Sequence, residues 1–537
     1  MCADLKAHMK INKRRTLPNS KEMVVNYNKR TVPESISEHN DPMRVEWTEI
    51  PSDPNEAPEY IAGEAALRIP DFSVPRYKLY WPIRHGWCNE KDYATKNLLF
   101  QDIALILEEA MKSQLGLTRK KDWGQYSCVF AIPDLYEKCY VTQILDMLMR
   151  DFGFSRVCFI QESLAGTFGA GYTSACVVDI GAQKTSICCV DEGMCIENSR
   201  VNLKCGGADV TETFIKMMLH DHFPYDEINL NRRYDYLLAE ELKKNTCTLN
   251  ETNVSVQVFD FHLRASGQDT RKYTFKAYDE ILLAPMGLFE PEIFLDMSHK
   301  LQGRRKLIDR SYDVYDGQPN DPVSAAQTEI LSTIAPPLPQ SDSATNGTAS
   351  ASANDIQSTP SRPQAVNASF TRVQDLEGTP RSSVAGSPGP ETPQGGSTPM
   401  PGAQTNGATS HPTVEIRDDI VPVYPLDNAI FTSISNAARA DDRKFTDFLG
   451  GILVIGGSSL VSGFHAFLEE RLQTRRPAYA SHIMVGTPPR ELDPQVVVWK
   501  GASVFGKLEV TNDSWIGRLE YDRLGSRVMT YKCMFAW

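Results

Sequence analysis

The chain has 537 residues, of which 41% are hydrophobic, and its formal net charge at pH 7 is −12. This length and apolar content allow a large core, in two major domains. The acidic balance excludes a protein that coats nucleic acid over its whole surface. No stretch approaches the roughly 18 apolar residues of a membrane span, and the polar, basic first residues do not form a secretory signal.

The twelve cysteines are scattered, with no C-x-x-C pair. Without a secretory signal, this pattern indicates reduced and mostly buried thiols, in the cytosol or the nucleus. Cys188 and Cys189 lie within an apolar stretch, where small side chains suit a buried strand better than a reactive site. The histidines form no H-E-x-x-H motif, and we assign no zinc site.

Strand-like and helix-like segments alternate along the chain, which predicts an α/β protein. Their periodicity predicts, in chain order, a strand over 126–133, a helix over 136–152, a strand and small-residue helix over 156–171, a hairpin over 173–193, and a strand, glycine turn and amphipathic helix over 451–473. No repeat of 20–50 residues appears in these segments.

Composition changes sharply over residues 314–413, which are dominated by Ser, Thr, Pro, Gly, Ala, Gln and Asn. Such a segment buries too little apolar area to offset its ordering entropy, so we expect it to be disordered and to interrupt one folded domain. Its five Ser/Thr-Pro dipeptides begin at Thr359, Thr379, Ser387, Thr392 and Thr398. Two interpretations stay open: an extended spacer, or sites of proline-directed phosphorylation.

Two turns carry the chemistry that the sequence predicts. Asp179-Ile180-Gly181 follows an apolar strand and forms the turn of the predicted hairpin, and an acidic, glycine-bearing turn of this kind can hold a phosphate and its metal ion. Gly456-Gly457-Ser458 ends another apolar strand, and we expect the glycines to open a helix whose N-terminal N–H groups attract anions. Each turn alone is weak evidence for phosphate binding, because a tight turn with a purely structural role has the same residues.

Other motifs are weaker. Gly501 to Lys507 fits G-x-x-x-x-G-K, but Leu508 follows where a P-loop needs a hydroxyl, so we reject a P-loop. Basic clusters occur at 13–15, 304–306 and 475–476. They are either solvated surface or, in a chromatin protein, candidate contacts to DNA phosphates.

Several segments together resemble the actin family, in colinear order over roughly residues 75–310 and 420–537. They are WPIRHGWCNEKD (81–92), VVDIGAQKTSICCVDEG (177–193), KCGGADVTE (204–212), LVIGGSSLVSGF (453–464) and the C-terminal segment 499–533. The resemblance implies an α/β, ribonuclease-H-like duplicated fold with two lobes, each a five-stranded sheet with helices, around an ATP cleft. It implies one lobe from 1–172 and 497–537, and the other from 173–313 and 414–496.

The resemblance also implies site residues for ATP or ADP with magnesium, namely Gln161, Asp179, Gly181, Lys243, Gly456, Gly457 and Ser458. Asp179 stands where the family orders the metal through water, and Gln161 stands where the family orients the attacking water. Two ligating groups differ, since Ile180 and Ala182 replace a hydroxyl and a carboxylate. Lys244 stands where an adenine-side glutamate is usual.

The family's first phosphate hairpin is not found, because MCADLKAHMKINKRR contains no D-x-G or similar strand pair. We therefore expect the first lobe to lack two strands of its sheet, through an incomplete or variant gene product, and we expect weak ATP binding. Losing even one preorganised stabilising group typically costs a factor of about 10²–10³ in rate. Catalytic turnover is not expected.

Within the family, the segments are similar to those of the nuclear actin-related subunits of Ino-eighty-type chromatin remodellers. This implies a non-catalytic nuclear scaffold that packs with actin and a second nuclear actin-related protein on a long helix of the motor subunit. It also implies binding to nucleosomes, histones and linker DNA, in transcription regulation, DNA recombination and DNA repair, with no membrane partner. The alternatives are a weak ATPase of the actin and sugar-kinase superfamily, or a cytoplasmic actin-like filament protein.

Overall fold

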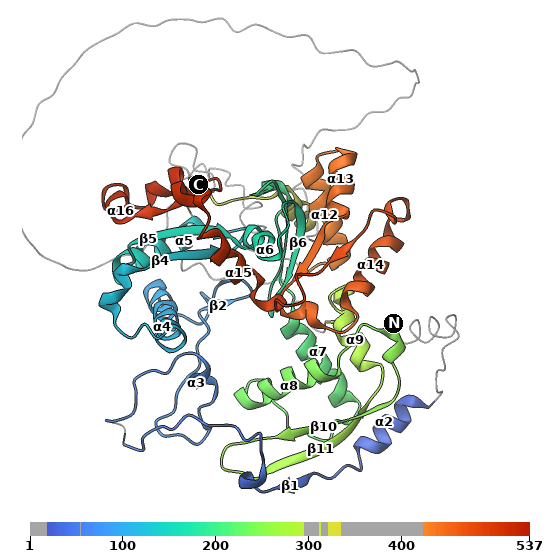
Figure 1. Cartoon of the computed structure of the whole chain (residues 1–537). Helices are drawn as coiled ribbons and strands as arrows, with labels where there is room; N and C mark the ends of the chain where they lie inside the picture. Colours follow the sequence, from blue (N-terminus) through green and yellow to red (C-terminus); the bar gives the residue numbers. More distant parts are fainter. Residues whose placement is uncertain (1–18, 54, 295–310, 313–319, 335–422) are drawn as a thin grey trace, which may run out of the picture. The chain divides into compact units, whose positions relative to one another are not determined.

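The computed structural model describes residues 19–53, 55–294, 311–312, 320–334 and 423–537 (Figure 1). Its α-helices are α2 (Ser20–Asn28), α3 (Glu64–Leu67), α4 (Lys96–Leu115), α5 (Lys138–Asp146), α6 (Glu162–Ala170), α7 (Gly207–His220), α8 (Arg233–Thr246), α9 (Glu280–Met286), α10 (Ala325–Ile334), α12 (Leu426–Ala438), α13 (Asp442–Leu449), α14 (Phe464–Arg475), α15 (Val497–Phe505), α16 (Arg518–Leu524) and α17 (Met529–Lys532). Its strands are β1 (Glu34–Ile36), β2 (Ile83–Arg84), β3 (Trp87–Cys88), β4 (Ser127–Ile132), β5 (Arg156–Gln161), β6 (Ala175–Ile180), β7 (Thr185–Asp191), β8 (Met194–Cys195), β9 (Val201–Leu203), β10 (Gln257–Leu263), β11 (Thr270–Ala277), β12 (Ile452–Ile455), β13 (Val485–Gly486) and β14 (Ile516–Gly517).

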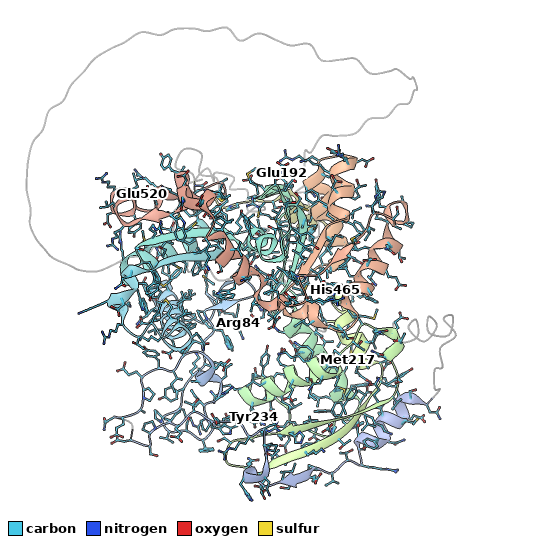
Figure 2. All side chains as sticks on the ribbon, viewed as in Figure 1. Arg84, Glu192, Met217, Tyr234, His465 and Glu520 are labelled. Carbon is cyan, nitrogen blue, oxygen red and sulfur yellow. The ribbon has the colours of Figure 1, made fainter. Side chains whose placement is uncertain are left out.

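The largest sheet is built around β6. Its strand order is β13-β12-β6-β7-β8, and β9 also pairs with β7. β6 and β7 form the predicted antiparallel hairpin. The next turn, between β7 and β8, carries Glu192 (Figure 2). β12 runs parallel to β6, with Ile455 opposite Asp179. Because the two strands end together, the turns that follow them meet at one edge of the sheet.

Both faces of this sheet are covered, which explains why its strands are almost continuously apolar. Figure 1 shows α6 on one side of β6 and α12 on the other. Alternate side chains of β6 enter different cores: Val177 packs with Leu164 of α6, and Val178 packs in the core that contains Ile430 of α12. The hairpin is therefore held rigidly from both faces.

A second sheet has the order β14-β5-β4, with β4 parallel to β5 over all six residues. Helix α5 connects the two strands and buries Val141, Ile144 and Leu145 in a core with Trp123. The helix that follows β4 begins and ends as its periodicity predicts, although residues 147–151 continue it as one π-helical turn.

Each of the two sheets contains two parallel strands joined by a helix. These units are β4–α5–β5 in the smaller sheet and β12–α14–β13 in the larger sheet. In the large sheet, β6, β7 and β9 lie beyond β12. No strand of the described residues lies beyond β4. The expected lack of the first hairpin stays a prediction, because residues 1–18 lie outside the described part of the chain.

Helices α6 and α15 cross at very short range between the two sheets. A Cβ added to Gly501 would lie 1.7 Å from the carbonyl oxygen of Ala165, and one added to Gly169 would lie 2.2 Å from that of Val497. Glycine is therefore required for the two backbones to approach. Gly501 lies inside α15, which confirms that the G-x-x-x-x-G-K match is not a P-loop.

A third sheet, β1-β11-β10, packs on α2. Asn28 at the end of α2 pairs with the edge of the sheet, because its side chain accepts a hydrogen bond from Lys276 N at 2.8 Å and donates one to Lys276 O at 3.1 Å. Beyond β1, buried Asp41 accepts hydrogen bonds from Arg264 and Thr270 at 2.7 and 2.8 Å. These contacts attach the first described residues to β10 and β11.

The disorder expected over 314–413 is wrong at its start. Residues 325–334 form α10, which buries Ala326, Ile330 and Leu331 against α12 and β9. Gln327 fixes the helix, since its side chain accepts from Asn202 N at 2.8 Å and donates to Asn202 O at 3.1 Å. The prediction used the mean composition of a long polar segment, and that mean does not reveal the helical spacing of these few apolar residues. Residues 335–413, with all five Ser/Thr-Pro dipeptides, lie outside the described residues.

A second correction concerns the Gly456-Gly457 turn, which does not open a helix directly. It leads into a short 3-10 turn over Gly457–Leu460, and α14 begins only at Phe464, after Gly463 in the left-handed region at φ +83°. The other predicted strands and helices are confirmed within one to three residues at their ends. The described cysteines are unpaired, and seven of them are buried, as expected.

Candidate nucleotide site

The β6–β7 turn is the centre of the candidate site. Gly181 N donates to Lys184 O at 2.9 Å, which closes the four-residue turn. Asp179 precedes it on β6, opposite Ser186 of β7. The turn is held by β6 and β7, both buried, so its carbonyl groups have fixed directions.

The start of α7 packs directly on this turn. Gly207 N donates to Gly181 O at 3.0 Å, and Ala208 N donates to Ala182 O at 2.7 Å. A Cβ on Gly206 would lie 2.4 Å from Gly181 O, so only glycine allows this approach. The first N–H groups of α7 are thus bound to protein carbonyls, and the helix end is docked on the hairpin.

The turn after β12 reaches the same point. Ser458 Oγ donates to Gly181 O at 3.0 Å. Gly456 has φ +89°, and a Cβ there would lie 2.4 Å from Asp179 Oδ1. Gly457 begins the 3-10 turn beside Gln495. The structure therefore brings Asp179, Gly181, Gly456 and Ser458 together, and Asp179 and Gly456 are in contact.

Lys243 joins the group from α8. Its Nζ donates to Gly207 O at 3.0 Å and pairs with Glu240 Oε1 at 2.7 Å. A Cβ on Gly207 would lie 2.7 Å from Ser458 Oγ and 3.3 Å from Lys243 Nζ. The hydroxyl and the ammonium thus both lie beside Gly207.

Gln161 lies on a different element and points elsewhere. It ends β5, is 3% exposed, and its Nε2 donates to Asp134 O at 3.3 Å. The next residue, Glu162, makes an ion pair with Lys184 of the hairpin turn. The link between β5 and the hairpin is therefore made by Glu162, a residue that the sequence reasoning did not select.

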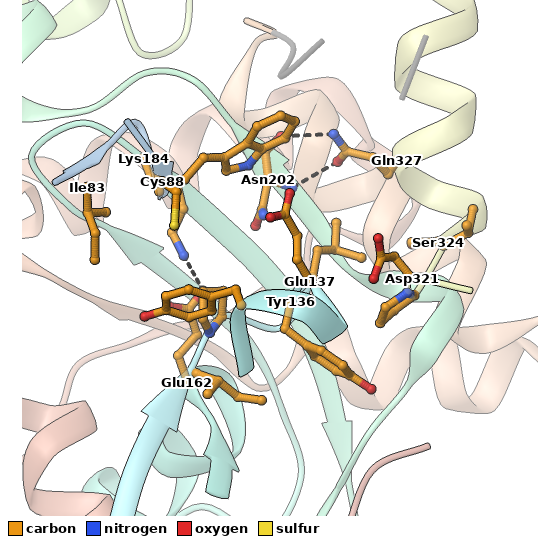
Figure 3. Close-up of a pocket in the computed structure, with 18 of the residues that line it drawn as sticks. Ile83, Cys88, Tyr136, Glu137, Glu162, Lys184, Asn202, Asp321, Ser324 and Gln327 are labelled. Carbon is orange, nitrogen blue, oxygen red and sulfur yellow. Dashed lines mark hydrogen bonds and ion pairs between the residues drawn. The ribbon is translucent and has the colours of Figure 1, made fainter. Parts of the chain in front are cut away.

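Lys184 is the central cation of the site. It is 15% exposed, as is Glu162, and Figure 3 shows their ion pair at the wall of a cavity. Burial lowers the pKa of Lys184, but the charges of Glu162, Asp179 and Asp134 outweigh this and raise it. Lys184 is therefore a permanent cation at physiological pH.

Two carboxyl groups near Lys184 have raised pKa values. Burial, followed by the charge of Glu162, raises the pKa of Asp179 to about 6, against the opposing effect of Lys184. The same two causes raise the pKa of Asp134 to about 7, although Ser163 donates to it from Oγ at 2.6 Å and from N at 3.2 Å. Both carboxyl groups therefore hold a proton more readily than an exposed aspartate does.

A cavity of about 470 Å³ opens beside this ion pair. Its lining includes Ile132 of β4 and Gly86 of the β2–β3 turn. Asn202 of β9, Gln327 of α10, Glu162 and Lys184 also line it (Figure 3). Asp179 and Gly456 are not part of the lining. The cavity therefore adjoins the candidate site from the side of the β4 edge.

One group of three potential metal ligands lies together among the described residues. Oxygen and sulfur atoms of Asp134, Cys188 and Cys195 lie within 4.8 Å of one another. Burial raises the pKa of the Cys188 thiol, and hydrogen bonding to Cys188 raises that of Cys195. Protonated thiols are poor metal ligands, so the cluster is best described as a buried hydrogen-bonded network.

The residues present do not fit a magnesium ion of the kind that the resemblance implies. Mg²⁺ prefers carboxylate and water oxygens in near-octahedral geometry. Ala182 offers no side-chain oxygen, Asp179 is pressed against Gly456, and the Lys184 ammonium already lies among the acidic groups. The role of Asp179 in ordering a metal ion through water therefore stays a prediction.

The family model for actin matches residues 19–262 and 423–534. The chain belongs to the actin family. Within it, the chain is similar to the probable actin-related protein 8 of Schizosaccharomyces pombe (strain 972 / ATCC 24843), at 38% identity over 534 residues, which cover 99% of the chain and 74% of the relative. Actin-like protein ARP8 of Saccharomyces cerevisiae (strain ATCC 204508 / S288c) is 29% identical over 607 residues, covering 99% and 62%.

Actin-related protein 8 of Homo sapiens is 30% identical over 538 residues, covering 98% of the chain and 80% of the relative. A solved structure of human actin-related protein Arp8 in its ATP-bound state superposes with a TM-score of 0.69 at 26% identity, covering 98% of the chain and 82% of that structure. The predicted actin-like α/β fold and the resemblance to actin-related protein 8 are confirmed. The exact subdomain boundaries stay a prediction.

None of the helices in the described ranges combines the length and the apolar character that crossing a membrane requires. The sequence reasoning missed Lys184, Glu162, Gly206 and Gly207. Gly206 and Gly207 lie within the segment 204–212 that resembles the actin family. The signal for the ion pair was the pair of opposite charges at Glu162, which follows Gln161, and at Lys184 in the hairpin turn. Its partners are 22 residues apart, so only the fold brings them together.

Proposed function

We propose that the chain is a non-catalytic, nucleotide-binding actin-related subunit of an ATP-dependent chromatin remodelling complex in the nucleus. The observation that carries the nucleotide part is the convergence of the hairpin turn, the start of α7, Lys243 and the Ser458 turn on Gly181 and Gly207. Glycines at each approach let these main-chain and side-chain groups come this close together. The relative solved in its ATP-bound state supports ATP as the ligand.

The same geometry argues against turnover. Phosphoryl transfer depends on metal, water and charge stabilisers held in place together. Ala182 and Ile180 carry no ligating group, and the Gln161 amide is buried on Asp134 O instead of pointing toward a phosphate. A bound nucleotide then acts as a structural ligand, because a ligand that binds only the folded state stabilises it.

Single-turnover hydrolysis of radiolabelled ATP by the purified full chain tests this part. We expect product formation at the buffer background, equal for wild type and Asp179→Asn. Hydrolysis above background that Asp179→Asn abolishes would instead establish the weak ATPase. Lys216→Met, an exposed ion-pair lysine on α7, is the control for a change of surface charge.

The scaffold part concerns assembly with actin and a second nuclear actin-related protein on a long helix of the motor subunit, and contacts to nucleosomes, histones and linker DNA. The names of the relatives support a place among the actin-related proteins. The last 42 residues also expose several large apolar side chains, as a docking surface requires. These are Val496, Trp499, Val510, Leu519, Leu524, Tyr531 and Met534.

Assembly is tested by mixing the chain with actin, the second actin-related protein and the motor helix, followed by size-exclusion chromatography. Trp499→Glu, at a side chain that is 69% exposed, should prevent co-elution without unfolding the chain. Met194→Glu, at a residue 62% exposed on β8, is the matched control and should assemble normally. Wild type that is folded yet never co-elutes would refute the scaffold. Nucleosome binding by gel shift then tests the chromatin contact.

A further inference from the structure

Lys184 occupies a position that is unusual for a lysine. Its aliphatic stem passes beneath the β2–β3 turn, where a Cβ on Gly86 would lie 2.3 Å from Lys184 Cδ and 3.4 Å from its Cβ. The same turn is fixed by His85 N, which donates to Gln183 Oε1 at 3.2 Å. Gly86, at φ +77°, thus fits over the lysine, and the ammonium is directed inward.

At its inner end, the ammonium meets acidic groups from three elements. It pairs with Glu162 at the start of α6, and the charges of Asp179 on β6 and Asp134 after β4 also act on it. Buried charges persist only when they are paired. The ion pair with Glu162, together with the two nearby aspartates, makes this a built cation position.

The hairpin turn lacks the groups that would bind a metal ion in competition with this lysine. Ala182 stands at the place of a second carboxylate and is exposed, with its carbonyl bound to Ala208 N at 2.7 Å. A divalent ion beside Asp179 would also be repelled by the Lys184 ammonium. Anionic phosphates, by contrast, are attracted by an ammonium held on rigid elements.

We propose that Lys184 supplies the positive charge of this nucleotide site in place of a divalent cation, so that nucleotide binds without Mg²⁺. The inference rests on the nucleotide-binding role proposed above. Glu162 holds the ammonium at the hairpin turn, Gly86 allows the lysine stem to pass, and Asp179 serves as a further anionic neighbour instead of a metal ligand.

The test is the dissociation constant of ATP for the full chain, measured by isothermal titration calorimetry in excess EDTA and in excess Mg²⁺. We expect wild-type values within about threefold of each other. Lys184→Met should weaken binding about tenfold or more in both buffers. Lys216→Met is the control for loss of a lysine and should bind as wild type does.

A second pair of variants separates charge from folding. Lys184→Met leaves Glu162 unpaired, so Lys184→Met/Glu162→Gln removes both charges and keeps both shapes; it should fold, by circular dichroism, and still bind ATP weakly. Lys184→Met/Ala182→Asp should instead regain ATP binding only when Mg²⁺ is present, because an oxygen ligand then replaces the ammonium.

The outcomes are distinct. Wild type that binds ATP in Mg²⁺ and loses it in EDTA would overturn the inference and leave the nucleotide-binding role intact. If Lys184→Met/Glu162→Gln bound ATP as tightly as wild type in EDTA, that result would overturn the inference as well. No ATP binding by wild type in either buffer would overturn the nucleotide-binding role itself, and this inference with it.

Discussion

Ser458 Oγ donates a 3.0 Å hydrogen bond to the carbonyl oxygen of Gly181, a residue 277 positions earlier in the chain. Gly207 N donates to the same oxygen at 3.0 Å. One carbonyl therefore joins the β6–β7 turn, the start of α7 and the turn after β12. Because each contact needs a close backbone approach, glycines decide whether the site forms.

Gly456→Ala tests this dependence. The new methyl group would meet Asp179 Oδ1 at 2.4 Å and Ile180 O at 2.5 Å, in addition to the cost of a left-handed φ. We expect the free energy of unfolding to fall by about 3 kcal/mol in urea titrations. Gly193→Ala, at φ +80° with open space around it, is the control and should cost only about 1 kcal/mol. Equal losses would contradict the close contact with Asp179.

Gly501→Ala tests the crossing of α6 and α15. Alanine in place of glycine inside a helix normally stabilises by about 1 kcal/mol. Here the methyl group would lie 1.7 Å from Ala165 O, so the helices must separate, and we expect a net loss of about 3 kcal/mol. Gly450→Ala, at φ −76° with its nearest neighbours at 3.5 Å, should change stability by less than about 1 kcal/mol. A stabilised Gly501→Ala would refute the close crossing.

Much of the fold followed from sequence, because alternating strand and helix patterns and the two glycine turns are local signals. The hairpin and β12 were predicted on that basis, whereas a shared site for Asp179 and Gly456 was implied only by the resemblance to the actin family. Features that depend on distant partners were not predicted. The Lys184–Glu162 pair needs the start of α6 to be placed beside the β6–β7 turn, and α10 becomes stable only against α12. A short helix gains most of its stability from such packing.

Asp427→Asn tests a buried charge cluster in the core between α12 and α14. The Asp427 side chain is fully buried and accepts from Arg471 Nε at 2.6 Å and Arg475 Nε at 2.5 Å. Removing its charge leaves two guanidinium groups without their common partner, and we expect a loss of about 3 kcal/mol by thermal or urea unfolding. Asp522→Asn breaks the exposed pair with Arg518 and should cost less than about 1 kcal/mol.

The acid stability of the chain should depend on Asp41. Hydrogen bonds from Arg264, together with those from Met43 N and Thr270, hold the pKa of this carboxyl well below its usual range. A lowered folded-state pKa means that the unfolded chain binds more protons in acid. The stabilisation is therefore complete above the ordinary aspartate pKa of about 4 and declines as the pH falls further.

Urea unfolding midpoints at pH 7, 4 and 3 measure this effect. Wild type should exceed Asp41→Asn at pH 7, and the difference should shrink below pH about 4. Asp513→Asn, at an exposed aspartate, is the control for the loss of one negative charge. A difference that is constant across the three pH values would rule out the role of the Arg264 contact.

The outer side of β4 matters beyond the site. Among the described strands, β4 is paired only with β5, although it carries Val129 and Phe130 in its middle. A row of free main-chain N–H and C=O groups on an apolar strand is a template for pairing between molecules. Concentrated samples of the chain should therefore scatter light increasingly with time, and low protein concentration will favour monodisperse material for every measurement above.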